Sequence, residues 1–150
     1  MDFDVPAYAG LFAAALVAAT ILPAQSEILL VTLLARGGLD PVALVAVASA
    51  GNVLGSILNW VLGRFLIHLR HHRWFPLKPA AYDRAVGWYG RHGVWSLLLA
   101  WLPIVGDPLT VVAGALRVDL TRFILLVSIG KIGRYVFIAV STLWWTDGAV

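Results

Sequence analysis

Four charged side chains stand inside otherwise apolar stretches of this 150-residue chain. Glu27 and Asp107 are carboxylates that follow Leu-Pro pairs, whereas Lys131 and Arg134 lie in a later apolar run. Ionisable groups within a membrane are costly, and they usually face a bundle interior or a wet cavity. The cations would attract an anionic headgroup, and the carboxylates could exchange protons because an apolar environment favours the neutral acid. We therefore predict substrate binding by Lys131 and Arg134, and gating or proton coupling by Glu27 and Asp107.

Each of these charges also has a purely structural interpretation. Asp107 followed by Pro108 is an ordinary N-cap and helix start, and the two acids could simply neutralise the two cations as buried pairs. Two asparagines in an apolar run, Asn52 and Asn59, are candidates for substrate binding, yet such amides also bond across helices. The four charges together favour the functional interpretation, because intramembrane ionisable residues are functional by default.

The composition places these groups in a membrane protein. Hydrophobic residues make up 61% of the chain and charged residues 13%, whereas a soluble domain is about half apolar and about a quarter charged. The absence of cysteine excludes disulfides and thiolate metal sites, and His68, His71 and His72 are expected in a basic loop rather than at a metal. No nucleophile–base pair, phosphate loop or dinucleotide fingerprint occurs. We predict a non-enzyme without cofactor, metal or nucleic-acid partner.

The first apolar stretch, residues 5–35, is predicted to form a re-entrant hairpin. It carries a single charge, Glu27, and it is too long for one span of about 20 residues and too short for two. Pro23 interrupts it, because proline removes a helix hydrogen bond and clashes with the preceding turn. An alternative stays open, in which residues 5–22 cross the membrane fully and the N-terminus lies in the cytoplasm.

A second apolar stretch, residues 93–116, has the same character. Its flanks on both sides are basic, which places both on the cytoplasmic side by the positive-inside rule. A hairpin satisfies that condition and a full span does not. The predicted breaks near its middle are Pro103, Gly106 and Pro108.

Two longer apolar runs, residues 41–63 and 120–145, are predicted to cross the membrane because each exceeds about 20 residues. The segment between the halves is strongly basic, which indicates a cytoplasmic loop, and its end at residues 82–92 suits a short interfacial helix. The whole chain is predicted to be one membrane domain. Its parts are half one at about 5–66, the basic loop with the interfacial helix at 67–92, and half two at about 93–146.

The two halves carry the same order of features. Leu22-Pro23 recurs 80 residues later as Leu102-Pro103, and Gly51-Asn52 recurs 79 residues later as Gly130-Lys131. With hairpin one opening outside and hairpin two inside, the halves have opposite topology. Broken apolar segments at matching positions indicate a transporter-type site near the membrane midplane. We therefore predict an all-α integral membrane fold, with an inverted repeat of two re-entrant helical hairpins and long transmembrane helices.

The chain resembles the DedA family, also called the VTT or SNARE-associated domain family, and above all its short YqaA-like branch. The resemblance implies two opposed hairpins in a multi-pass protein of the bacterial inner membrane that supports membrane homeostasis. It also implies translocation of lipid carriers such as undecaprenyl phosphate, or phospholipid scrambling, with proton coupling through hairpin acids such as Glu27. The stretches that carry it are Leu22 to Glu27, Gly51 to Gly55, Leu62 to Phe65, Trp101 to Leu109, Ala113-Gly114, and Gly130-Lys131 with Arg134-Tyr135.

The sequence departs from the better-studied branch of that family at the second hairpin. That branch carries essential arginines on both sides of the hairpin proline, and the matching positions here are Ala100 and Gly106. Lys131 and Arg134 are expected to supply the missing charge from the neighbouring helix. The predicted function is a translocase of a lipid phosphate or phospholipid, with membrane lipids as partners and with homo-oligomer formation left open. The alternative is a non-transporting packing or assembly factor, whose hairpin tips would be dry and whose acids would stay paired.

Overall fold

The computed structural model describes residues 4–19, 25–69, 71–73, 75, 77–103 and 105–148, and all regular elements among them are helical. The predicted all-α class is therefore confirmed. In chain order the elements are α1 (Val5–Ala18), α2 (Gln25–Arg36), α3 (Pro41–Leu66), the 3₁₀ helix η1 (Ile67–Leu69), α4 (Pro79–His92), the 3₁₀ helix η2 (Gly93–Trp101), α5 (Gly106–Ala115) and α6 (Leu120–Asp147).

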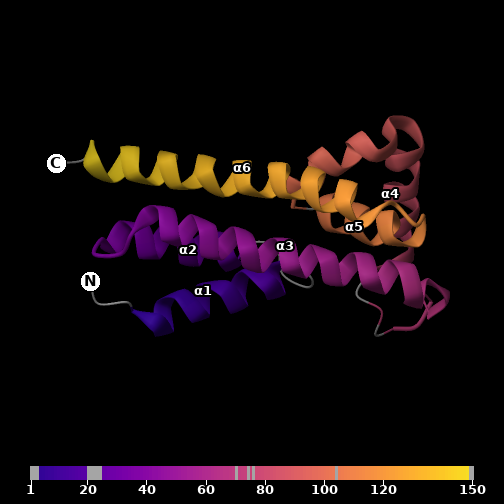
Figure 1. Ribbon diagram of the computed structural model, residues 1–150, viewed down its shortest axis with the longest axis horizontal. Coiled ribbons are helices and arrows are strands. Elements are labelled where there is room, and N and C mark those ends of the chain that lie inside the picture. Colours follow the sequence, from indigo (N-terminus) through magenta and orange to yellow (C-terminus); the bar gives the residue numbers. More distant parts are fainter. Residues whose placement is uncertain are drawn as a thin grey trace.

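Two long helices, α3 and α6, run through the molecule side by side and in opposite directions (Figure 1). The stretches Pro41–Leu69 and Leu120–Thr146 are long and apolar enough to cross a membrane. Both helices begin at an aspartate that caps the first turn. Asp40 Oδ1 accepts a hydrogen bond from the Val42 amide at 2.9 Å, and Asp119 Oδ1 accepts one from the Arg122 amide at 3.1 Å.

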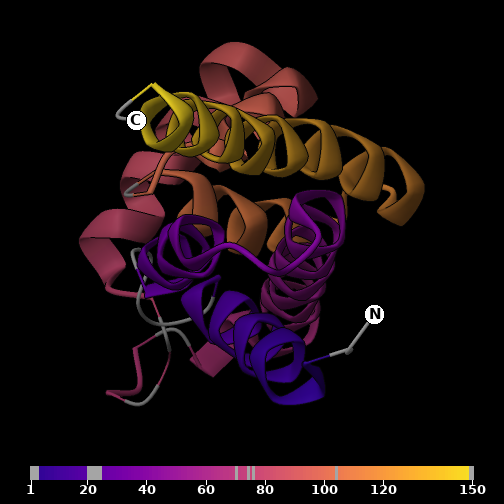
Figure 2. The ribbon, with the colours of Figure 1, turned by 90° about the vertical axis from the view of Figure 1, so that its left-hand side faces the viewer.

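The shorter helices are divided between the two ends of this pair. In Figure 1, α1 and α2 lie beside the end where α3 begins, and α4, η2 and α5 lie beside the other end. Both views place α3 between α1 and α6 (Figures 1 and 2). Each end has its own apolar core, one including Leu11, Leu30 and Leu44 and the other including Trp60, Leu109 and Phe123.

A stripe of glycines on α3 lets two other helices come into backbone contact with it. A Cβ at Gly51 or Gly55 would meet the backbone of α1, and a Cβ at Gly63 would strike the carbonyl oxygen of Val111 on α5. From α5, Gly114 approaches the Trp60 carbonyl in the same way. Small residues at this four-residue spacing allow such a close approach, and the stripe is shared between α1 and α5.

Of the three predicted breaks in the second hairpin, only one lies between two helices. The interruption between η2 and α5 includes Pro103, whereas Gly106 and Pro108 belong to the first turn of α5. Pro108 is tolerated there because first-turn amides have no intrahelical acceptor. The interpretation of Asp107 as an N-cap is wrong: Val105 holds that position, because its carbonyl oxygen accepts the first hydrogen bond of the helix, from the Leu109 amide at 3.2 Å.

Two helix ends also differ from the prediction, and one predicted break cannot be compared. Pro23, the predicted break of the first hairpin, lies outside the described residues. The helix expected at 82–92 begins earlier, at Pro79, which suits the first helical position. The helix expected to end at residue 63 continues to Leu66, with the Arg64 guanidinium 5.2 Å from the Trp60 ring centre in a cation–π contact.

Candidate functional site

The four charged residues singled out in the sequence come together as two ion pairs near the middle of the bundle. Lys131 Nζ lies 2.9 Å from Asp107 Oδ1, which connects α6 to α5. The Arg134 guanidinium pairs with the Glu27 carboxylate, which connects α6 to α2. Both cations lie near the middle of the Leu120–Thr146 stretch. The structure thus assigns each acid to one cation, a pairing that the sequence left open.

The guanidinium of Arg134 also contacts the end of η2. Its Nη1 donates a hydrogen bond to the carbonyl oxygen of Trp101 at 2.6 Å. The close approach of η2 to α6 depends on Gly130, because a Cβ there would lie 2.8 Å from the carbonyl oxygen of Leu98. Arg134 is therefore held between the beginning of α2 and the end of η2, at the meeting point of the two halves of the chain.

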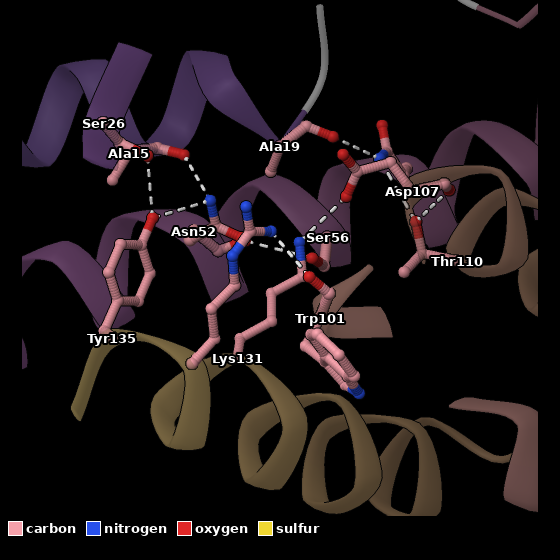
Figure 3. A network of polar contacts seen from close by, with 12 residues as sticks. Ala15, Ala19, Ser26, Asn52, Ser56, Trp101, Asp107, Thr110, Lys131 and Tyr135 are labelled. Carbon is pink, nitrogen blue, oxygen red and sulfur yellow. Dashed lines mark hydrogen bonds and ion pairs between the residues drawn. The ribbon is translucent and has the colours of Figure 1, made fainter. Parts of the chain in front are cut away.

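A hydrogen-bonded chain beside the ion pairs includes two residues, Ser26 and Tyr135, that were not predicted as site residues. Asn52 Nδ2 donates to the Ala15 carbonyl at 3.1 Å and to the Tyr135 hydroxyl at 3.0 Å. The Tyr135 hydroxyl and Ser26 Oγ are 2.9 Å apart (Figure 3). Tyr135 follows Lys131 by four residues on α6, so helical spacing alone could have indicated that they share a face.

Asn59 forms a second buried connection, between α1 and α5. Its Nδ2 donates to the Ala19 carbonyl at 2.7 Å and to Thr110 Oγ1 at 3.2 Å. Thr110 Oγ1 in turn donates to the carbonyl oxygen of Asp107 at 2.6 Å. The amide nitrogens of both predicted substrate-binding asparagines are therefore engaged by protein groups, and their substrate role stays a prediction.

A cavity of about 650 Å³ lies next to one ion pair and not the other. Its walls include Glu27 and Arg134, whose side chains are 24% and 20% exposed. Lys131, at 5% exposure, and Asp107 are not among its lining residues. The cavity is lined by Glu27, Trp101, Pro103, Gly130, Gly133, Arg134, Phe137 and Ile138.

A much smaller void of about 10 Å³ lies between the two cations and is also lined by Glu27. Asn52, Lys131, Arg134 and Glu27 are among the side chains around it. That volume is close to the minimum of about 10–15 Å³ that a single water molecule needs. The centre is therefore tightly packed, with one accessible ion pair and one enclosed pair on either side of the void.

The residues that could hold a metal ion do not gather at this site. Over the described ranges, no group of three or more His, Cys, Asp or Glu side chains is close enough to bind one. The site therefore offers paired charges, amides and hydroxyls, which can bind an anion or transfer a proton.

Comparison with known proteins gives consistent matches over most of the chain. The model of the VTT domain family matches residues 22–142. The inner membrane protein YqaA of Escherichia coli strain K12 is 40% identical over 141 residues, which cover 90% of this chain and 93% of the relative. An uncharacterized protein of Haemophilus influenzae is 38% identical over 84% of this chain and 81% of its own length. The E. coli inner membrane protein YghB is 32% identical over 72% of this chain and 51% of its own length. No solved structure matches.

Proposed function

Because the chain belongs to the VTT domain family, also called the DedA family, we propose that it moves a lipid phosphate or phospholipid between the leaflets of a bacterial inner membrane. Two relatives are named inner membrane proteins, and two helices here are long enough to cross a bilayer. The observation that carries the proposal is the Glu27–Arg134 pair, which lines an open-sided cavity halfway along one of those helices.

The proposed topology is an inverted repeat of two re-entrant hairpins in a multi-pass protein. The packing of the helices supports it, because α1 packs on α3 as η2 packs on α6, and α2 packs on α6 as α5 packs on α3. Exchanging the two halves leaves these four pairings unchanged, whereas the packing of α2 on α3 has no comparable counterpart of α5 on α6 among the described residues. The opposite directions of α3 and α6 (Figure 1) are those that two halves of opposite orientation would have.

The lengths of the hairpin arms support the same topology. The longest arm, α1, has 14 residues, which gives about 21 Å at about 1.5 Å per residue. A hydrocarbon core of about 30 Å is too thick for such a helix to cross untilted. The arm ending at Ala18 therefore favours a hairpin over the alternative in which residues 5–22 form a full span.

The ion pair at the cavity suggests how an anion is bound and released. Glu27 neutralises Arg134 in the resting arrangement. When the Glu27 carboxyl takes up a proton, it loses its charge, and the guanidinium can donate charge-assisted hydrogen bonds to two phosphate oxygens. Loss of that proton restores the pair and expels the anion. Lys131 is the deeper cation, and its bond to Asp107 links α6 to α5 until the anion arrives.

Liposome reconstitution tests this function. The protein is placed in vesicles that carry a phosphate-bearing lipid, and transfer between leaflets is followed over a series of pH values. Arg134→Ala and Lys131→Ala are expected to abolish transfer while the protein remains folded. Arg122→Ala is the matched control, because it removes the same type of charge from the exposed first turn of the same helix. Transfer at the control rate in both test variants would remove their assigned role.

A second candidate, a non-transporting packing or assembly factor, is favoured by one observation. Both acids are paired, and the asparagine amides are engaged within the protein. Such a factor would show no lipid transfer in wild-type vesicles, and Arg134→Ala would affect it only through stability. The wild-type transfer rate therefore distinguishes the two candidates.

A further inference from the structure

We infer that the cavity beside Arg134 is entered sideways from the lipid and receives one acyl chain, and that Gly133 sets the width of this entrance. The inference rests on the proposed function and makes it more specific. The substrate would be an anionic lipid whose headgroup reaches Arg134 while its chain lies across α6 at Gly133. A water-soluble phosphate would not qualify.

The walls of the cavity have the chemistry that such a molecule requires. Of the eight described residues that line it, six are apolar or glycine, and the two charged ones are Glu27 and Arg134. An apolar wall with a few convergent polar groups is the usual composition of a small-molecule site. Arg134 supplies the complementary charge for an anionic headgroup, and Glu27 is the group that this headgroup would replace.

The position of the opening indicates where the occupant comes from. Phe137 is 73% exposed and Trp101 43% exposed, so the cavity reaches the molecular surface between them. Two other residues of α6, Ile129 and Ile132, are also exposed near the middle of the apolar stretch. At that depth the surroundings are hydrocarbon rather than water. An entrance there admits a molecule already dissolved in the bilayer.

The volume limits how much of the lipid enters. About 650 Å³ lies within the range of about 300–1,000 Å³ typical of sites for small molecules. A whole phospholipid is larger than the molecules that such sites enclose. We therefore place the headgroup and the first part of one chain inside, with the remainder of the lipid staying in the membrane.

Gly133 is the residue whose size would control whether the chain of the lipid can enter the cavity. It lines the cavity and is exposed, and a Cβ placed on it would meet no heavy atom within 4 Å. A side chain at this position would therefore fit the folded protein and would occupy the space assigned to the lipid. Gly130 cannot be tested in the same way, because its Cβ would lie 2.8 Å from the Leu98 carbonyl oxygen.

The test compares Gly133→Leu with Gly10→Leu in vesicles. Gly10 is the matched control, since it is also exposed, helical and free of atoms within 4 Å of a Cβ, but it lies on α1 away from the cavity. Transfer of a long-chain lipid phosphate is expected to fall by about tenfold or more in Gly133→Leu, because overfilling a packed site is costly. Gly10→Leu is expected to keep the wild-type rate. Gly133→Ala should give an intermediate rate, which preserves the test if leucine impairs folding.

The outcomes separate the two proposals. Equal rates for Gly133→Leu, Gly133→Ala and Gly10→Leu would overturn the entrance at Gly133 and leave the proposed function standing. Wild-type transport of glycerol phosphate as fast as the long-chain lipid would overturn the lipid occupant. No wild-type transfer of any phosphate-bearing lipid would reject the proposed function itself, and the inference with it.

Discussion

Replacing Lys131 with methionine should destabilise the protein more than the same replacement of Arg134. Lys131 is 5% exposed and contacts Asp107 at 2.9 Å, so its removal leaves this carboxylate without its partner and, unlike Glu27, away from the cavity. Breaking a buried pair costs about 3–5 kcal/mol, and we expect about 3 kcal/mol because the Asp107 side chain keeps 22% exposure.

The Arg134→Met variant should lose less stability for a structural reason. Glu27 is left beside a cavity of about 650 Å³, where it can be hydrated or protonated. We expect a loss of about 1–2 kcal/mol, which lies between the values for exposed and buried pairs. The assay is the free energy of unfolding in mixed micelles, titrated with a denaturing detergent and followed by tryptophan fluorescence.

A double variant tests whether the unpaired carboxylate of Asp107 causes the loss of stability. Lys131→Met combined with Asp107→Asn removes both charges of the enclosed pair, so most of the lost stability should return. Equal losses for Lys131→Met and Arg134→Met, or a double variant no more stable than Lys131→Met alone, would refute the distinction between an enclosed and an accessible pair.

Three further variants test other contacts. Gly63→Ala should lower the free energy of unfolding by about 1–3 kcal/mol, because its Cβ would strike the Val111 carbonyl; Gly90→Ala, which meets nothing within 4 Å, should not lower it. Tyr135→Phe should cost about 1 kcal/mol by removing the hydroxyl bonded to Ser26 and Asn52, and no loss in the same titration would discount that chain. Glu27→Gln should make lipid transfer independent of pH in vesicles, since the amide cannot exchange a proton; an unchanged pH profile would assign the coupling to another group.

The long helices were predictable because the signals that start and sustain them lie within the helix sequence itself. Asp40 followed by Pro41 fixes the start of α3, and an uncharged run of sufficient length fixes its class. Its end was placed too early, because a charge usually terminates a span and the contact of Arg64 with the Trp60 ring cannot be read from composition. The start of α5 was misplaced for a similar reason, since the Val105 carbonyl accepts the first hydrogen bond of this helix, from the Leu109 amide, two residues before Asp107.

The members of the candidate site were partly predictable, and their roles were not. Isolated charges in apolar runs identified the four ionisable groups, since desolvation makes such residues costly. Which acid meets which cation depends on how α2 and η2 pack on α6 and how α5 packs on α3 and η2, and that is a tertiary property. The same packing encloses Lys131 and leaves Arg134 beside the cavity, although the two residues are only three positions apart.

The most direct test of the account is the side of the membrane on which each hairpin opens. The chain contains no cysteine, so single cysteines can be labelled without background. Exposed positions flank both hairpins: Asp4 and Arg36 for the first, Arg91 and Thr121 for the second. With an impermeant thiol reagent, Asp4→Cys and Arg36→Cys should react only from outside intact cells, and Arg91→Cys and Thr121→Cys only in inside-out vesicles. Two flanks of one hairpin reacting from opposite sides would contradict the account.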